Sequence, residues 1–448
     1  MPNHKFRVAI CGGGIGGLTL AVALAKHHDI DVVIYEAAKR LTEIGAGVGL
    51  WPRAWKILKA LGLDGDLAAA SLDPPTEDLV TAFQYRKSDR PNGLHFYDLH
   101  TQGNLLKFHR ADFQGVLLKH LPPSSHTHCS KRLESYSQSI AGPVELKFQD
   151  GSTATCDLLI GADGVKSAVR GSLLRELANQ AVMEGKPDVA QEALAGIDPV
   201  WSGMVAYRAL IPAERLRALS PSHRALTEPT QYLGKNAYII VYPISQGNII
   251  NLAAFNVSGT EGARFDGPWV KEATKEAFQT AFANWEDDVQ ILLQAVDKVS
   301  HWAVHTVRHL PALNFGRVAI LGDASHSMEP HQGSGAGQAI EDAAILAALL
   351  SHPQTTRDSI PLALDVYDQI RRPYSIKISQ SSRLNGRYFT FQYDGGEDLE
   401  HCTDEELKAR LVDLGLAFTD NWKWAWSTTV DGMLAEAVQT LNDRYDNV

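Results

Sequence analysis

Two glycine-rich segments that lie far apart in the chain carry the clearest chemical signal. The first, 12–17, fits the pattern G-x-G-x-x-G between an apolar strand pattern and a helix pattern. Here Gly12 permits a tight turn, Gly14 lets a pyrophosphate approach the backbone, and Gly17 lets helix and strand pack closely. Glu36 ends the next strand pattern, about twenty residues on, where a carboxylate can bind a ribose. The segment predicts a dinucleotide site, and the acid favours NAD or FAD over NADP.

The second segment, 322–337, reads GDASHSMEPHQGSGAG and joins an apolar strand pattern at 318–321 to a strong helix pattern at 339–350. A glycine-rich loop at a helix N-terminus presents bare N–H groups and the positive end of the helix dipole, so it favours an anion. Asp323 directly follows the strand, where its carboxylate could bind ligand hydroxyls. The alternative for Asp323 is a turn or N-cap residue.

Composition limits the classes of protein to which the chain can belong. The 448 residues are too many for one core, so two large domains are expected. A net charge of −10 without any Lys/Arg run argues against a nucleic-acid partner. No apolar stretch is long enough to span a membrane, and no signal-peptide pattern begins the chain, which predicts a cytoplasmic protein. Four widely spaced cysteines predict reduced thiols, and no His/Cys cluster suggests a metal.

The elements expected around these segments alternate between helical and strand patterns. A strand–helix–strand unit covers 6–36, and 171–200 is expected to be helical. The Asp150-Gly151 pair predicts a hairpin between strands at 144–148 and 153–160. The other elements expected are helices at 52–62 and 112–121, strands at 204–211, 238–244 and 249–257, and helices after 321. The chain is therefore expected to leave a first domain, build a sheet domain and return.

Three blocks of the sequence, taken together, resemble the group A flavin-dependent aromatic hydroxylases, and among them the fungal-type, salicylate-hydroxylase-like branch. The first block is 12–17 with Glu36, the second is GADGVKSAVR at 161–170, and the third runs from 322 to 343. The segment HRAD at 109–112 is also similar to the family's arginine-containing helix start. The blocks stand in the family's order, and the resemblance covers nearly the whole chain.

The resemblance implies an α/β fold: a Rossmann-like FAD-binding domain of three layers (ββα), a discontinuous mixed β-sheet substrate domain and a helical C-terminus. FAD would be bound non-covalently, and NADH or NADPH would be a transient reductant, which fits the lack of a second G-x-G-x-x-G. The expected parts are 1–174 for the FAD domain, with a substrate-domain excursion near 75–108, then 175–310 for the sheet domain, 311–390 for the FAD-domain return and 391–448 for a C-terminal helical segment.

The residues that the resemblance places at FAD cluster in the three blocks and at neighbouring strand ends. They are Gly12, Gly14, Ile15, Gly17, Glu36, Ala37, Gly49, Arg110, Asp163, Arg170, Asp323, Pro330, Gly333, Gly335 and Ala336. The last three would open the final helix, whose dipole favours an anion at the flavin N1–C2=O edge. The alternatives are a solvated side chain for Arg110, a common turn for Asp163 and a surface arginine for Arg170.

Four residues are candidates for the substrate side of the flavin: Arg208, Tyr238, Pro330 and His331. A buried Arg208 needs a partner, which could be an anionic substrate; the alternatives are a structural salt bridge or a role in supporting FAD. Related fungal dearomatising hydroxylases hold a phenolate with an Arg and a Tyr in similar places, although Tyr238 could instead be a core residue. Pro330 would lie beside the isoalloxazine, and His331 could carry a proton or pack the loop.

Two further features bear on the pocket. Trp51-Pro52-Arg53 stands where the branch commonly has Pro-Asn-Ala, so Trp51 could wall the substrate while Arg53 departs from the pattern. Trp422, Trp424 and Trp426 are expected to serve packing or a dimer contact, with no chemical role. The oligomer expected is a monomer or a homodimer.

The activity that the resemblance implies is hydroxylation of a phenol or aromatic acid by NAD(P)H and O₂ through a C4a-hydroperoxyflavin, without a metal. Oxidative decarboxylation, simple hydroxylation and oxidative dearomatisation of a polyketide phenol remain open. So do a reductase or dehydrogenase on the same fold, a non-catalytic flavin-binding protein, and an NAD-dependent dehydrogenase without flavin.

Overall fold

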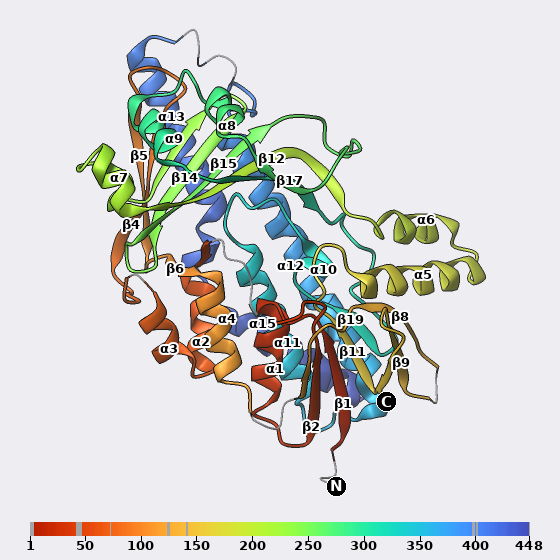
Figure 1. Ribbon diagram of the computed structural model, residues 1–448. Helices are drawn as coiled ribbons and strands as arrows, with labels where there is room; N and C mark the ends of the chain where they lie inside the picture. Colours follow the sequence, from red (N-terminus) through yellow and green to blue (C-terminus); the bar gives the residue numbers. More distant parts are fainter. Residues whose placement is uncertain are drawn as a thin grey trace.

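The computed structural model describes residues 4–41, 47–71, 73–122, 126–139, 142–396, 399 and 402–447. Its elements form two sheet-based regions with a long helical segment along both (Figure 1). None of the helices in the described part of the chain is long and apolar enough to cross a membrane.

The first region is built on a six-stranded sheet in the order β18-β19-β11-β1-β2-β7. All neighbouring strands are parallel except the short β18, which pairs antiparallel with β19. The strands are β1 (Phe6–Cys11), β2 (Ile30–Tyr35), β7 (His126–His128), β11 (Leu158–Gly161), β18 (Asn314–Phe315) and β19 (Val318–Ile320). Both faces of this sheet are covered at its centre, so β1, β11 and β19 are almost continuously apolar.

Helices cover one face of the six-stranded sheet, and a small antiparallel sheet covers the other (Figure 1). The small sheet is β8 (Leu133–Ser137), β9 (Val144–Phe148) and β10 (Thr153–Cys156). The helical layer consists of α1 (Ile15–Leu24), which contacts β1 and β2, and of the helices packed around it: α4 (Arg110–Lys119) and α11 (Gly335–Leu350) on α1, α2 (Pro52–Ala60) on α11 and α3 (Asp64–Ala70) on α4. These are the three layers expected of the FAD-binding domain, and the α/β fold class is confirmed.

The second region is an eight-stranded mixed sheet in the order β16-β17-β12-β15-β14-β13-β4-β5. Only β13 and β4 run parallel. The strands are β4 (Leu79–Lys87), β5 (Leu94–Gln102), β12 (Val200–Pro212), β13 (Thr230–Gly234), β14 (Ala237–Ile244), β15 (Ile249–Val257), β16 (Val270–Ala273) and β17 (Val299–Thr306). The sheet is discontinuous in sequence, because β4 and β5 come from a segment that interrupts the first region.

Side chains that alternate along the strands give this sheet two different faces. On β14, Ile239 and Val241 pack in an outer core with α7 (Ala213–Leu219), α8 (Lys275–Ala281) and α9 (Asp287–Ala295). Tyr238 and Tyr242 point to the opposite face and belong to another cluster. The outer helices thus close one face and leave the other turned toward the first region.

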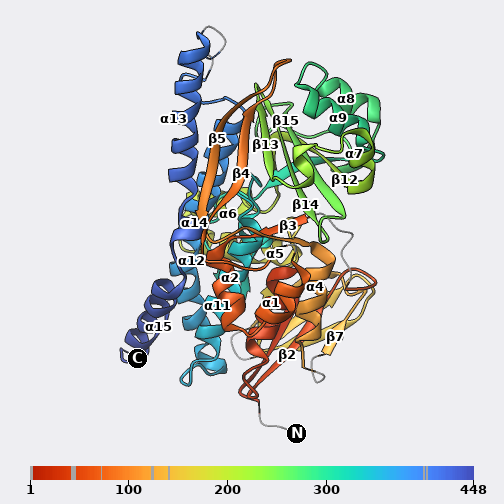
Figure 2. The ribbon, with the colours of Figure 1, turned by 90° about the vertical axis from the view of Figure 1, so that its left-hand side faces the viewer.

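The C-terminal helices join the two regions. The helix α12 (Ile360–Phe389) runs along both, α13 (Asp404–Trp422) packs on β5, and α15 (Asp431–Tyr445) packs on α11 (Figure 2). The short α14 (Trp424–Ser427) lies between α13 and α15 and packs on α2. The helical C-terminus expected from the sequence is therefore present.

Two local expectations differ from the structure. The pattern at 153–160 is not one strand, because it divides at Asp157 into β10 of the small sheet and β11 of the six-stranded sheet. Asp157 fixes this change of sheet: its N–H donates to the Arg7 carbonyl at 3.0 Å, and its carboxylate accepts from the Arg7 N–H at 2.8 Å. Residue 175, the expected start of the sheet domain, lies inside α5 (Ala168–Met183), which packs on β8, β11 and β19, and α6 (Pro187–Ala195) packs on α5.

Candidate FAD and substrate site

A cavity of about 900 Å³ lies between the carboxyl ends of the parallel strands and the inner face of the eight-stranded sheet. The first region lines it with the 12–17 segment, the end of β2, the loop after β11 and the loop after β19. The second region lines it with side chains from β12, β13, β14, β15, β17 and β4. The carboxyl edge of a parallel sheet is the usual ligand site of such folds.

The glycine-rich turn at the start of α1 forms one end of the cavity. Gly12 has φ +116°, and a Cβ there would lie 2.1 Å from the Ala162 carbonyl oxygen. No side chain caps α1, so its first N–H groups are available to an anion. Glu36 accepts hydrogen bonds from the N–H groups of Gly13 at 2.7 Å and Ala38 at 2.6 Å, and it also lines the cavity. The remaining lone pairs of its carboxylate suit ribose hydroxyls.

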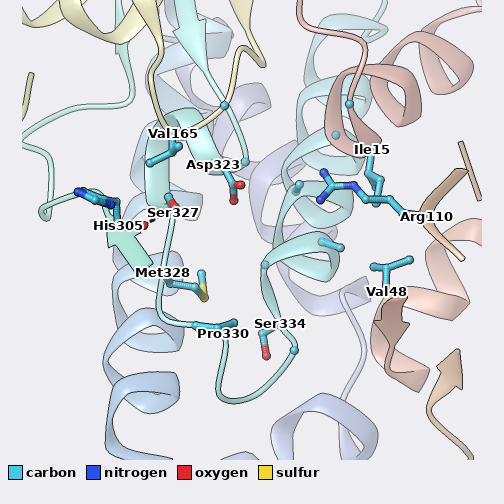
Figure 3. Close-up of a pocket in the computed structure, with 18 of the residues that line it drawn as sticks. Ile15, Val48, Arg110, Val165, His305, Asp323, Ser327, Met328, Pro330 and Ser334 are labelled. Carbon is cyan, nitrogen blue, oxygen red and sulfur yellow. Dashed lines mark hydrogen bonds between the residues drawn. The ribbon is translucent and has the colours of Figure 1, made fainter. Parts of the chain in front are cut away.

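Asp323 and Arg110 face the middle of the cavity from opposite sides (Figure 3). Asp323 begins the short α10 (Asp323–His326) and is exposed to this space, while Arg110 begins α4. Burial lowers the pKa of Arg110, and the negative charge of Asp323 opposes that shift. A carboxylate and a guanidinium across a gap suit a ligand with both hydroxyl and phosphate groups.

The loop after α10 and the strand β3 (Gly47–Leu50) face each other across the next part of the cavity. Met328, Pro330 and Ser334 lie on one side and Val48 on the other (Figure 3). Gly333 has φ +59°, and a Cβ at Gly335 would meet only Asp323 Oδ1, at 3.9 Å. The N-cap residue Ser334 makes no side-chain cap, so the N-terminus of α11 is open to an anionic ring edge.

The 161–170 block contains one residue that lines the cavity and one that does not. Asp163 lines it and accepts hydrogen bonds from the first N–H groups of α5, those of Ala168 at 2.8 Å and Val169 at 3.2 Å. Burial raises the pKa of Asp163, and these hydrogen bonds oppose the shift. Arg170 was expected at FAD, but it is fully buried away from the cavity and donates to three backbone carbonyls, those of Val165, Ile197 and Ala324. The Arg170 side chain therefore supports the loop between β11 and α5 from behind.

Arg208 is the only Asp, Glu, Lys or Arg that the described residues of the eight-stranded sheet contribute to the cavity. Its Nε has no hydrogen-bond partner, and its guanidinium forms no ion pair within the described part of the chain. The guanidinium carbon lies 5.2 Å from the ring centroid of Trp302. Burial lowers the pKa of Arg208. A half-buried guanidinium without a carboxylate partner among the described residues favours an anionic ligand.

Tyr238 and His331, predicted separately, form one hydrogen-bonded chain with Glu329. The Tyr238 hydroxyl lies 2.7 Å from His331 Nδ1, and His331 Nε2 lies 3.0 Å from Glu329 Oε2. Tyr238 and His331 line the cavity, whereas Glu329 lies behind them and retains 11% side-chain exposure. Burial raises the pKa of Tyr238 well above its ordinary value, and the charge of Glu329 adds to that shift. The chain leads from the cavity toward the surface.

Several cavity residues were not foreseen from the sequence. Tyr242, Gln231 and Trp422 line the cavity, although Trp422 was expected to serve packing or a dimer contact. Trp51 lines it as expected and donates from Nε1 to the Gln332 carbonyl at 2.9 Å. Alternation with Tyr238 could have indicated Tyr242, but no sequence signal links Trp422 to a strand so distant in the chain.

Arg53, the departure from the family pattern, points away from the cavity. It pairs with Glu341 at 2.8 Å and donates to Thr428 Oγ1 at 2.8 Å and to the Thr429 carbonyl. Glu341 and the neighbouring Asp342 also pair with the buried Arg371. Arg53 therefore ties the C-terminal segment to α11, and it does not enter the substrate space.

Comparisons with known proteins agree with this architecture. A family model described as an FAD binding domain matches residues 5–382. The chain is 35% identical to a salicylate hydroxylase of Pseudomonas putida, covering 98% of this chain and 96% of that protein. It is 34% identical to an FAD-dependent monooxygenase of Strobilurus tenacellus over 99% of both chains. Its structure resembles a salicylate hydroxylase solved as a substrate complex, with a TM-score of 0.80, 29% identity and 98% of both chains covered.

The chain belongs to the salicylate-hydroxylase-like family of FAD-dependent monooxygenases. The family relation accounts for the two open helix N-termini, the Gly12 turn and the position of Glu36, all of which fit an extended FAD. In this monooxygenase the described residues contain no group of three His, Cys, Asp or Glu side chains arranged to hold a metal.

Proposed function

We propose that this monooxygenase uses NADH or NADPH and O₂ to hydroxylate a phenolic or aromatic carboxylic substrate. The observation that carries the proposal is the half-buried Arg208, which has no ion-pair partner among the described residues and an unpaired, buried Nε, and which lies on the sheet that forms the far wall of the cavity. Names among its relatives, such as salicylate hydroxylase and 6-methylsalicylate 1-monooxygenase of Aspergillus terreus (32% identical), support the same substrate class.

The residues that would hold FAD are those that line the first part of the cavity. Glu36 would bind the ribose, the α1 N-terminus and Arg110 the pyrophosphate, and Asp323 the ribityl hydroxyls. The open N-terminus of α11 would stabilise negative charge at the flavin edge. Bound FAD supplies hydride acceptance from NAD(P)H and activation of O₂ for transfer of one oxygen atom to the ring.

The chain's own groups would hold the substrate and move its proton. Arg208 would pair with the carboxylate or phenolate and orient the ring. The Tyr238 hydroxyl would accept the phenol's hydrogen bond while it donates its own proton toward His331 Nδ1. Glu329 would stabilise the imidazolium that forms on His331. An electron-rich phenolate is the form that reacts with an electrophilic oxygen.

A substrate screen tests this function. With the FAD-loaded protein, hydroxybenzoates and acylated phenols should stimulate NAD(P)H oxidation, and the product should contain one atom from ¹⁸O₂. Stimulated oxidation without oxygen incorporation would identify a reductase and contradict the proposal. Products that retain or lose the carboxylate, or that lose aromaticity, would distinguish hydroxylation, decarboxylation and dearomatisation.

Arg208→Ala separates substrate binding from cofactor binding. The variant should bind the aromatic acid at least tenfold more weakly, since a charge-assisted hydrogen bond contributes about 1.5–3 kcal/mol, while its affinity for FAD changes less. Titration of the flavin absorbance with substrate gives the first affinity, and fluorescence titration with FAD gives the second. An unchanged affinity for substrate would remove Arg208 as the anion partner.

A further inference from the structure

The inner face of the eight-stranded sheet carries a row of paired residues that extends well beyond Arg208. Arg208 on β12 is paired with Ala253 on β15. Ala253 is paired in turn with Ile240 on β14, and Ile240 with Gln231 on β13. All four residues line the cavity. Neighbouring strands lie about 4.8 Å apart, so the Cα atoms of Arg208 and Gln231 are separated by about 14 Å across three strand spacings. One aromatic ring covers only part of this length.

The middle of the row leaves room for an apolar chain. Ala253 and Ile240 carry no polar atom, and Ala253 extends only one methyl group above the sheet. The Arg208 guanidinium lies beside Trp302 on β17, the strand on the side away from β13. A ring whose acidic group pairs with Arg208 would therefore leave the Ala253–Ile240 surface uncovered in the direction of Gln231.

The far end of the row is apolar but contains two unsatisfied polar groups. Gln231 as a whole residue is 1% exposed. Its side-chain amide makes one hydrogen bond, to the Tyr85 hydroxyl at 3.1 Å. Its other amide atom has no partner, and exchanging the amide oxygen and nitrogen leaves one atom unpaired in either case. The indole Nε1 of Trp422 also has none. Phe83, Leu105 and Trp51, which belong to the same apolar cluster as Trp422, also line the cavity, and Trp51 contacts Trp422 with ring centroids 5.0 Å apart.

We propose that this far end is a subsite for an uncharged hydrogen-bonding group, such as a hydroxyl, carbonyl or amide, at the end of an extended ring substituent. This rests on the proposed function and narrows its substrate to an aromatic acid or phenol with such a substituent. Buried polar groups in native proteins nearly always have partners, so Gln231 and Trp422 call for one. A charged terminus is disfavoured, because Arg208 is the only Asp, Glu, Lys or Arg contributed by the described part of this sheet.

The test uses the FAD-loaded protein and three probes. These are 2-hydroxybenzoate, its derivatives with a linear alkyl chain, and derivatives of equal length that end in a hydroxyl, each as the 4-, 5- and 6-isomers. Dissociation constants come from the perturbation of the flavin spectrum. For at least one isomer, the hydroxyl-terminated probe should bind about tenfold more tightly than its alkyl counterpart, the typical gain when a hydroxyl meets a buried unpaired group.

Variants then locate the preference. Gln231→Leu combined with Tyr85→Phe removes both partners of the existing hydrogen bond, so no new unpaired hydroxyl is left behind. Trp422→Phe removes the indole N–H and keeps a smaller aromatic wall. The double variant and Trp422→Phe should each bring the ratio of the two dissociation constants, alkyl probe to hydroxyl-terminated probe, from about ten toward one. Gln84→Leu is the matched control, because Gln84 precedes Tyr85 on β4 but lies outside the cavity lining, and it should keep the wild-type ratio.

The two levels of the proposal fail in different ways. If 2-hydroxybenzoate binds but no hydroxyl-terminated isomer exceeds its alkyl counterpart, the subsite is overturned and the proposed function stands. A ratio that survives both the Gln231/Tyr85 and the Trp422 variants also overturns it. If no hydroxybenzoate perturbs the flavin or stimulates NAD(P)H oxidation, the proposed function itself fails. Should the double variant not fold, the Trp422→Phe ratio decides.

Discussion

At the scale of single residues, Glu329 has the clearest untested role. It does not line the cavity, yet it lies 3.0 Å from His331 Nε2, whose Nδ1 lies 2.7 Å from the Tyr238 hydroxyl. The imidazole is held tightly, since a Cβ on Gly386 would lie 2.2 Å from His331 Cδ2. We therefore treat Glu329 as a positioning residue that orients the imidazole and stabilises its protonated form.

Glu329→Gln should lower kcat by about 10- to 100-fold and leave KM nearly unchanged, because the amide keeps the size of the side chain but removes its charge. The loss should shrink at high pH, where solution supplies the phenolate and the relay is no longer needed. The measurement is kcat between about pH 6 and pH 9. Glu261→Gln, which removes an exposed carboxylate paired with Arg383, serves as the control. A uniform loss at every pH would indicate a purely structural role.

Every residue that the sequence assigned to the site lines the cavity except Arg170, whereas Gln231, Tyr242 and Trp422 of the cavity wall were not assigned. Gly12, Glu36 and Asp323 belong to local strand–turn patterns, and local patterns survive folding. The prediction for Arg170 was wrong because its guanidinium donates to backbone carbonyls behind the cavity. A motif residue of this kind can support a ligand-binding loop without contacting the ligand. Trp422 could not be foreseen, since its place in the wall depends on how α13 docks beside β4 and β5.

At the scale of elements, a buried ionic cluster locks α11 to its neighbours. Asp342 on α11 accepts hydrogen bonds from the Gly322 N–H at 2.9 Å and from His326 Nε2 at 2.6 Å, and it pairs with Arg371 of α12 at 2.7 Å. Burial alone would raise the pKa of Asp342, but His326 and Arg371 outweigh burial and hold it below the ordinary value. This cluster fixes the glycine loop that Gly322 begins.

Because the pKa of Asp342 is depressed in the folded state, its stabilising effect is present above the unfolded pKa of about 3.9 and is lost as pH falls through the folded value. Asp342→Asn should therefore lower the free energy of unfolding at pH 7 by about 3–5 kcal/mol. It should also weaken the fall in stability below about pH 4. The midpoints of urea unfolding at pH 7 and below about pH 4 measure these two changes in stability. The control is Asp446→Asn, which replaces an exposed carboxylate. Equal losses for both variants at pH 7 would show that the cluster does not stabilise the fold.

At the scale of the whole molecule, the cavity lies at the interface between separate parts of the chain. Its walls come from the first region, the eight-stranded sheet and, through Trp422, the C-terminal helices. A ligand that binds at this interface stabilises the folded protein by mass action. At a ligand concentration of 100 Kd, the free energy of unfolding rises by about 2.7 kcal/mol. FAD should thus raise the melting temperature, and the size of that shift reports how well the parts are held by the cofactor.

Asp323 and Arg170 should separate cofactor binding from structural support, since the sequence assigned both to FAD. Asp323 is exposed in the cavity, so Asp323→Ala should leave the melting temperature of the apoprotein nearly unchanged but reduce the increase caused by FAD. Arg170 is fully buried, and Arg170→Ala would leave three carbonyls without their donor, so it should lower the melting temperature with and without FAD. Differential scanning fluorimetry at several FAD concentrations measures both. If Asp323→Ala keeps the full FAD-dependent shift, the cofactor is held by the other groups assigned to it, which are Glu36, Arg110 and the two open helix N-termini.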